Sequence, residues 1–402
     1  MRAMNVLCSV LTSFLSTSLC SVAVPEEGMS TVDIIAHHGY PVQEVTATTQ
    51  DGFVLVMHRI PYGRKEKVPS SPRPVAFLQH GLLASSADWV LNLPEQSLGF
   101  MLADSGFDVW MGNVRGNVYS RQRSNGTGEY WDFSWDEIAA FDLPAMIDKA
   151  LEVSEQPWLY YVGYSQGTMM MFAHVSEQPE FARKIKKFFA LAPVGTVKNV
   201  HGFLKIIGTN FLPEIELFIR LSGEKEFLPS NMLSKVISKL VCGVFAFTNP
   251  LCSNVLFQIV GPNTKQLNET RLMVYLSHTP AGTSTQNIIH WAQMTQSGAT
   301  LKYDWMSESK NEQHYGQKSP PSYNFTRAAV PTYLYYSDAD WIADTQDVQT
   351  LLSVLPQDSI EGRRNLTGFN HIDFVYGMRA AREIYDEIIA TMKEYERNVI
   401  RP

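Results

Sequence analysis

The chain has 402 residues, of which 45% are hydrophobic and 18% are charged, so it can bury a large core and is neither fibrous nor disordered. Its 33 Lys and Arg residues against 40 Asp and Glu residues give a net charge of -7, which offers no broad basic surface and argues against nucleic acids as partners. Length and composition are compatible with one large domain that carries an insertion and also with two domains.

The first residues predict a secretory signal peptide. Arg2 precedes an uncharged run over residues 6–24, in which Ser21 and Ala23 have the spacing of a cleavage site. We expect cleavage near Ala23, so that residues 1–23 leave the mature chain. A membrane anchor is the alternative, but Ser and Thr residues interrupt the run and an acidic sequence follows it, which favours cleavage.

Strand and helix patterns alternate along most of the chain. Asp51-Gly52 separates two extended stretches and predicts a hairpin. Helical stretches are expected over Asp136–Ala150 and Met169–Lys186. Strands that alternate with helices predict a mostly parallel sheet covered on both faces. The expected sheet strands are short apolar runs at residues 75–78, 107–111, 158–162, 188–191 and 332–336.

From about Val197 to Ser322 this alternation fails, and the chain becomes helical, apolar and interrupted by Gly and Pro. We interpret residues 197–322 as an inserted cap between two parts of one core, residues 24–196 and 323–402. Leu240–Val260 contains no charged residue, but Asn249-Pro250 breaks it into short pieces, so we expect no membrane span in the mature chain.

The stretch "YYVGYSQGT" from Tyr160 predicts a turn that exposes a nucleophile. Such an elbow needs a strand, a turn that forces strained dihedrals on the serine, and a helix packed so closely that only small neighbours fit. Residues 158–162 can supply the strand, Gly163 and Gly167 are the small neighbours of Ser165, and the helical pattern follows from Thr168. An ordinary structural turn is the alternative reading.

A serine hydroxyl needs a general base, and the base needs an orienting carboxylate. Asp338 and Asp340 follow the last apolar run, and His371 comes later in the chain, which is the order of an α/β-hydrolase triad. Spacing does not separate the two acids. Asp344 is expected instead to cap the helix that begins at Thr345, with Asp347 as the reciprocal acid.

Backbone N–H groups must stabilise the oxyanion that forms during acyl transfer. One is expected from Gln166, which directly follows Ser165, and the other from the glycine loop at residues 80–83, where Leu82 is our choice. The sequence contains no metal-binding cluster, no Walker loop and no dinucleotide fingerprint, so no cofactor is expected.

The cysteines and sequons agree with export. Cys242 and Cys252 remain after signal cleavage, and an oxidising compartment favours a disulfide between them over two buried thiols. Four Asn-x-Thr patterns are candidate glycosylation sites, at Asn125, Asn268, Asn324 and Asn365.

The sequence resembles the acid lipase family of α/β-hydrolases, which includes lysosomal acid lipase and gastric lipase. The resemblance covers about residues 32–392. It is carried by several ordered strings, namely "FLQHGLLASSADWV" from Phe77, "GFDVWMGNVRGN" from Gly106, "FSWDEIAAFDLPAMID" from Phe133, "YYVGYSQGT" from Tyr160, "SHTPAGTSTQN" from Ser277 and "NHIDFVYG" from Asn370.

The resemblance implies Ser165 as nucleophile, Asp340 as acid and His371 as base, with Leu82 and Gln166 as oxyanion donors. It also implies a helical cap with a lid over an apolar cleft, in a secreted or lysosomal enzyme. The expected substrates are triacylglycerols and sterol esters, met at an oil-water or lipoprotein interface. The alternatives are an esterase or acyltransferase acting on smaller soluble esters, and a lipid carrier without activity, against which the intact triad argues.

The sequence departs from the family pattern at three places. Tyr164 stands where the family usually has histidine, Ser337-Asp338 replaces a Gly-Gly pair before the acid, and Val260 replaces a third cap cysteine. The first change alters the surroundings of the elbow. The second adds a carboxylate near the triad, so the pH optimum cannot be transferred from relatives.

Overall fold

The computed structural model describes residues 24–69, 71–124, 129–202, 205, 225–227, 257 and 259–400. The expected signal peptide, Asn125 and both Cys242 and Cys252 lie outside these residues. The expected disulfide therefore remains a prediction.

A mixed sheet forms the centre of the fold, with the strand order β1-β2-β4-β3-β6-β7-β10-β11, and with β5 paired to β2. The pairs from β4 through β3, β6, β7 and β10 to β11 are all parallel, and β1, β2 and β5 pair antiparallel. This arrangement confirms the predicted α/β-hydrolase class. The strands are β1 (Gln43–Thr48), β2 (Phe53–Ile60), β3 (Val75–Gln79), β4 (Asp108–Met111), β5 (Gln122–Arg123), β6 (Leu159–Tyr164), β7 (Ile185–Leu191), β10 (Thr332–Ser337) and β11 (Ile360–Leu366).

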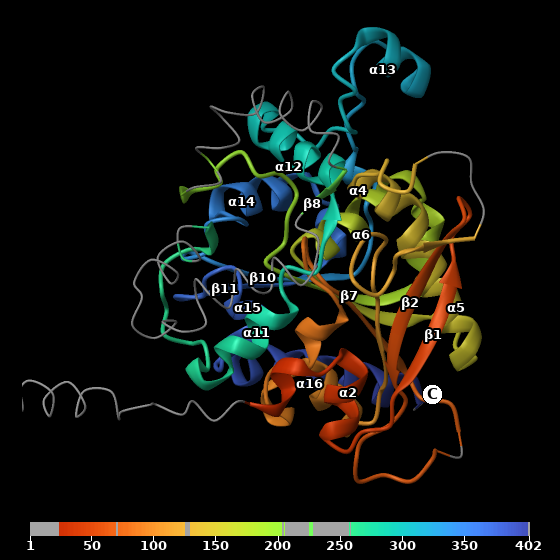
Figure 1. Ribbon diagram of the computed structural model, residues 1–402, viewed down its shortest axis with the longest axis vertical. Coiled ribbons are helices and arrows are strands. Elements are labelled where there is room, and N and C mark those ends of the chain that lie inside the picture. Colours follow the sequence, from red (N-terminus) through yellow and green to blue (C-terminus); the bar gives the residue numbers. More distant parts are fainter. Residues whose placement is uncertain are drawn as a thin grey trace, which may run out of the picture.

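Helices cover both faces of the sheet (Figure 1). The helices of the core are α2 (Thr31–His37), α3 (Leu98–Asp104), α4 (Trp135–Glu137), α5 (Leu143–Ser154), α6 (Gln166–Glu177), α14 (Thr345–Val354), α15 (Asp373–Tyr376) and α16 (Asp386–Ile400). The predicted helix over Met169–Lys186 was too long. Pro179 cannot continue the hydrogen-bond ladder of α6, which ends at Glu177, and Lys186 belongs to β7.

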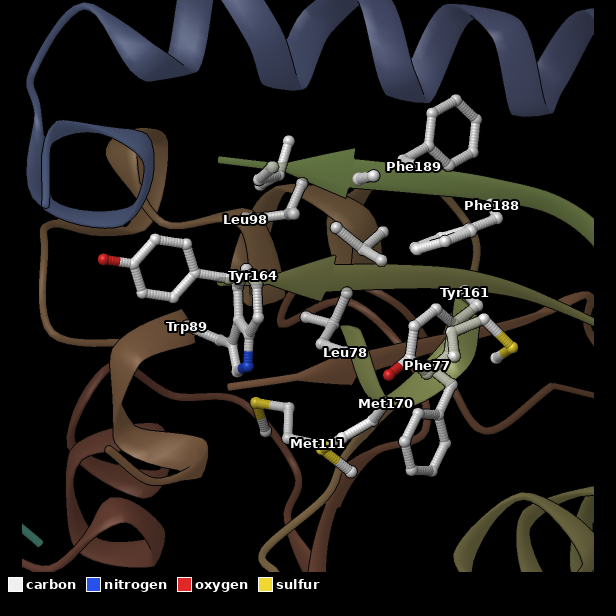
Figure 2. Packing of buried hydrophobic residues seen from close by; sticks show 14 of the residues in the cluster. Phe77, Leu78, Trp89, Leu98, Met111, Tyr161, Tyr164, Met170, Phe188 and Phe189 are labelled. Atoms are coloured by element: carbon white, nitrogen blue, oxygen red, sulfur yellow. The ribbon is translucent and has the colours of Figure 1, made fainter. Parts of the chain in front are cut away.

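Two adjacent tyrosines of β6 show why its side chains are all buried. Successive side chains of a strand point to opposite faces. The hydroxyl of Tyr160 donates to Glu396 of α16, whereas the hydroxyl of Tyr161 donates to the Gly167 carbonyl of α6. Figure 2 shows side chains on both faces of the neighbouring strands, with Phe189 of β7 toward the C-terminal helix and Met170 of α6 on the other side, near Phe77. A strand buried on both faces has the continuous apolar pattern expected from the sequence.

The described part of the expected cap, within residues 197–322, contains three α-helices and two short strands. They are α11 (Leu272–His278), α12 (Thr285–Ser297) and α13 (Glu308–Tyr315), and a short antiparallel pair joins β8 (Glu226–Phe227) to β9 (Thr283–Ser284). Figure 1 shows α13 at the end of a projecting arm. Among the described residues, no helix combines the length and apolar character that crossing a bilayer requires.

Arg115 is a buried cation that ties the loop after β4 to two acids. Its guanidinium donates to Asp142 at 2.7 Å and to Asp51 at 2.6 Å, and Asp142 is fully buried. Removing one partner of a buried ion pair leaves an uncompensated charge. We therefore expect Arg115→Met to lower the free energy of unfolding by about 3–5 kcal/mol in urea denaturation.

The matched control is Arg183→Met, which removes an arginine from an exposed pair with Glu180. Exposed pairs of this kind contribute roughly 0–1 kcal/mol. Equal losses for the two variants would contradict the structural role assigned to Arg115.

Candidate active site

Ser165 lies in the sharp turn between β6 and α6. Its φ of 53° and ψ of -119° are unusual for a residue with a side chain, and its N–H donates to the Leu191 carbonyl at 3.0 Å. A Cβ added to Gly163 would lie 2.8 Å from the Gly167 oxygen, and one added to Gly167 would lie 2.5 Å from the Gln79 oxygen. Only glycine fits at both positions, as the nucleophile-elbow interpretation requires.

Three loops at the carboxyl ends of the strands bring Ser165, His371 and Asp340 together. His371 Nε2 lies 2.8 Å from Ser165 Oγ, and His371 Nδ1 lies 2.9 Å from the nearer oxygen of Asp340. All three residues are buried. The N–H groups of Ile342 and Ala343 donate to Asp340 Oδ1, both at 2.9 Å, and fix the orientation of its carboxyl group.

The structure separates the two acids that the sequence left open. Asp340 contacts His371, whereas Asp338 is exposed and accepts the Gly368 N–H at 3.2 Å. Asp344 caps α14 as expected, by accepting the Gln346 N–H at 2.7 Å.

The predicted reciprocal bond of this cap is absent among the described contacts. Asp347 instead accepts both the backbone and the side-chain N–H of Asn199, each at 2.8 Å. The expected capping box at the start of α14 was therefore wrong. Asp347 connects α14 to the segment after β7.

The loop after β3 passes directly over Ser165. A Cβ added to Gly81, the residue before Leu82, would lie 3.0 Å from the Ser165 Cβ. Burial lowers the pKa of His80 to about 4, which keeps its ring neutral. Its Nδ1–H donates to the Gly81 carbonyl at 2.8 Å, and its Nε2 accepts the Val114 N–H at 3.4 Å. His80 thereby fixes the conformation of this loop.

The N–H groups of Leu82 and Gln166 have no acceptor within the part of the chain that the structure describes. Gln166 is the first residue of α6, where the helix supplies no acceptor for the N–H. Among the described residues both N–H groups are therefore unpaired, which fits the oxyanion role expected for them from the sequence.

Tyr164, the first departure from the family pattern, contacts His371, the residue expected to be the general base. Its hydroxyl donates to the His371 carbonyl at 3.0 Å, and the centroids of the two rings lie 5.2 Å apart. Burial raises the pKa of Tyr164 well above its usual value, so the hydroxyl stays a donor. The sequence identified Tyr164 as a departure from the family pattern but did not predict its contact with His371.

Val260, another departure, joins the acid loop to the base loop. Its carbonyl accepts the His371 N–H at 2.9 Å and the Trp341 N–H at 3.5 Å. The next residue, Gly261, has a φ of 117°, and an added Cβ would lie 2.3 Å from the Ala339 oxygen. Glycine is required there, and nothing in the local sequence pattern distinguished it from the other glycines.

Asp88 is a buried acid in the short helical turn Ser86–Trp89, which follows the loop after β3. It accepts the Tyr376 hydroxyl at 2.5 Å, and burial raises its pKa to about 7. A folded-state pKa above the unfolded value means that folding takes up a proton. The resulting stability is present below about pH 4 and is lost as the pH rises through about 7.

We therefore expect Asp88→Asn to flatten the fall of stability between about pH 5 and 7, by on the order of 2 kcal/mol. Thermal unfolding across this pH range gives the measurement. Asp358→Asn, at an exposed acid, is the control and should leave the curve unchanged. A wild-type slope retained in Asp88→Asn would rule out Asp88 as its source.

Comparison with known proteins agrees with this geometry. A family described as "alpha/beta hydrolase fold" matches residues 74–374, and one described as "Partial alpha/beta-hydrolase lipase region" matches residues 31–93. "Lipase lipl-3" of Caenorhabditis elegans is 48% identical over 391 residues, which cover 95% of this chain and 96% of that protein.

Two vertebrate lipases are similar over nearly their whole length. "Lysosomal acid lipase/cholesteryl ester hydrolase" of Rattus norvegicus is 43% identical over 98% of this chain and 99% of its own. "Gastric triacylglycerol lipase" of Homo sapiens is 44% identical over 92% of each chain. The solved structure of a soluble variant of monoglyceride lipase from Saccharomyces cerevisiae aligns with a TM-score of 0.50 and 15% identity, over 88% of this chain and 94% of that one. That likeness shows the fold alone.

Proposed function

The chain belongs to the lipases of the α/β-hydrolase family, and we propose that it hydrolyses carboxylic ester bonds of neutral lipids through an acyl-enzyme on Ser165. The observation that carries this proposal is the hydrogen-bonded chain from Ser165 Oγ through the His371 ring to Asp340, at a strained turn after β6. A serine triad is recognised by this geometry and by the role of each residue, rather than by the positions of the residues in the sequence.

In the first half of the reaction Ser165 Oγ attacks the ester carbonyl while His371 Nε2 takes the hydroxyl proton. The N–H groups of Leu82 and Gln166 stabilise the tetrahedral oxyanion. When the intermediate collapses, the bond to the alcohol breaks and His371 returns the proton to the leaving oxygen. Asp340 stays ionised and holds the Nδ1–H of His371 in place throughout.

In the second half His371 takes a proton from water, whose oxygen attacks the acyl carbon bound to Ser165. Collapse breaks the bond to Ser165 Oγ, which regains its proton from His371, and releases the fatty acid. Every proton is exchanged through one ring, so no cofactor is required.

We propose triacylglycerols and sterol esters as substrates, at an oil-water or lipoprotein interface, because relatives at this identity carry those activities in their names. The same relatives support passage through the secretory pathway to a secreted or lysosomal location. The raised pKa values of Asp88, about 7, and Asp373, about 6, suit folding in an acidic compartment, where both buried carboxyls are neutral.

Residues 197–322 are proposed to form the cap that shapes the acyl-chain site. Of the candidate glycosylation sites, Asn324 and Asn365 are exposed and Asn268 is half-buried. Exposure favours modification at the first two.

A substrate panel tests the function. Purified protein is assayed with emulsified triolein, cholesteryl oleate and a short soluble ester, each at one acidic and one neutral pH. We expect hydrolysis of at least one long-chain ester. Activity confined to the short ester would favour the alternative, an esterase or acyltransferase for small soluble esters. An added alcohol that captured the acyl group would identify the transferase.

A further inference from the structure

The side chain of Gln166 is anchored by helix α12, although its proposed role uses only its backbone N–H. Gln166 Oε1 accepts the indole N–H of Trp291 at 2.8 Å and the side-chain amide of Asn287 at 3.1 Å. Gln166 and Asn287 are 1% and 0% exposed, so these bonds replace water rather than compete with it. Because the indole can only donate, the atom of Gln166 that faces Trp291 must be the oxygen.

The same stretch of chain also holds the other oxyanion loop. The N–H of Ala281 donates to the Leu83 carbonyl at 2.7 Å. Leu83 directly follows Leu82, and its φ of 60° is unusual for a residue with a branched side chain. The hydrogen bond from Ala281 helps to hold this conformation, which positions the preceding Leu82 N–H.

This stretch is itself fixed to the core between its two contacts. The Ser284 hydroxyl donates to the Phe133 carbonyl and accepts the Asn287 N–H at 3.0 Å. Gly282 has a φ of 94°, and an added Cβ would lie 3.1 Å from the Gly116 oxygen. The stretch is therefore hydrogen-bonded to the core at Ser284 and packs closely against it at Gly282.

We propose that residues 281–291, which we call the oxyanion brace, position the two N–H donors that stabilise the transition state. Ala281 acts on the Leu82 side, and Asn287 and Trp291 act on the Gln166 side. The inference rests on the proposed hydrolase function and extends it to residues outside the triad and outside the two proposed oxyanion donors. Oxyanion donors must be held to within a fraction of an ångström, and their own support supplies that precision.

The test compares Trp291→Phe, which keeps an aromatic ring but removes the indole N–H, with Gln166→Met, which keeps the side-chain length but removes the acceptor. Turnover of a short soluble ester is measured per active site, counted by fluorophosphonate titration. Inhibition by butylboronic acid is measured in parallel, because its tetrahedral adduct on Ser165 places an oxygen at the oxyanion position.

Removing an oxyanion donor outright costs about 10²–10³ in kcat, so loosening one should cost less, about tenfold. We expect each variant to lose about tenfold in kcat and in boronate affinity, with KM within about threefold. The Trp291→Phe/Gln166→Met double variant should lose no more than Gln166→Met alone, because removing the acceptor already removes the contact with Trp291.

Trp158→Phe is the matched control. Trp158 precedes β6 at the end of the strand away from Ser165, with the Lys186 Nζ 3.5 Å from its ring centroid. Its kcat should stay within about twofold of wild type.

Unchanged kcat and boronate affinity per active site would overturn the brace, even if the variants unfold at lower temperature. If Trp291→Phe does not fold, Gln166→Met alone decides the question. Failure of the brace is distinguishable from failure of the proposed function, because only the latter predicts that Ser165→Ala remains active.

Discussion

Ser165→Ala is expected to lose on the order of a millionfold in kcat, because removing the nucleophile of a serine triad has an effect of that size. The methyl group of the introduced alanine cannot form the acyl-enzyme, and His371 is left without the hydroxyl that lies 2.8 Å from its Nε2. The variant should also fail to react with a fluorophosphonate probe. Hydrolysis is measured with the short soluble ester, and labelling is followed by intact mass.

The control for this variant is Ser176→Ala. Ser176 lies on α6, the helix that follows Ser165, is also buried, and its hydroxyl donates only to the Ala173 carbonyl at 2.8 Å among the described contacts. The Ser176→Ala variant should be labelled fully by the fluorophosphonate probe and should keep its activity to within about twofold of wild type. Persistent labelling of Ser165→Ala at wild-type stoichiometry would mean that another residue is the nucleophile.

The sequence predicted the elbow well because its requirements are local. A buried strand, two flanking glycines and a helix lie within a short stretch around Ser165, and each can be recognised from neighbouring residues. The same holds for the strands β3, β4, β6, β7 and β10, whose apolar runs reflect burial on both faces.

Strand β11 was not recognised because it lies at the edge of the sheet. Among the described strands it pairs only with β10, and most of its residues, Ile360–Leu366, are polar and partly or fully exposed. An edge strand needs no apolar run, so its sequence resembles that of a loop. The helix predicted through Lys186 ends earlier for a different reason, because Pro179 cannot continue the hydrogen-bond ladder of α6.

The supports of the active site could not be predicted because they join residues distant in sequence. Tyr164 reaches the His371 carbonyl, Val260 joins the acid and base loops, and Trp291 reaches Gln166. No periodicity or motif encodes such pairs. The sequence also could not decide which of Asp338 and Asp340 contacts His371, because that depends on how the turn after β10 directs each carboxylate.

Asp340→Asn is expected to lower kcat by roughly ten-thousandfold, the effect seen when a triad acid becomes an amide. The N–H groups of Ile342 and Ala343 both donate to Oδ1, so the amide oxygen of the variant should stay there and its NH2 group should face His371 Nδ1. The ring must then carry its proton on Nε2, where it cannot accept the proton of Ser165. The loss would therefore reflect the tautomer of His371 rather than unfolding.

Asp338→Asn makes the same chemical change two residues earlier and serves as the matched control. Asp338 is exposed, and an asparagine oxygen can still accept the Gly368 N–H that Asp338 accepts at 3.2 Å. Solvent screens a charge at that position, so kcat should stay within about tenfold of wild type. Steady-state kinetics on the short soluble ester, with unfolding temperatures of both variants, give the comparison. If Asp338→Asn were the inactive variant and Asp340→Asn the active one, Asp338 would be the residue that orients His371, and the geometry described for the turn after β10 would not be that of the working enzyme.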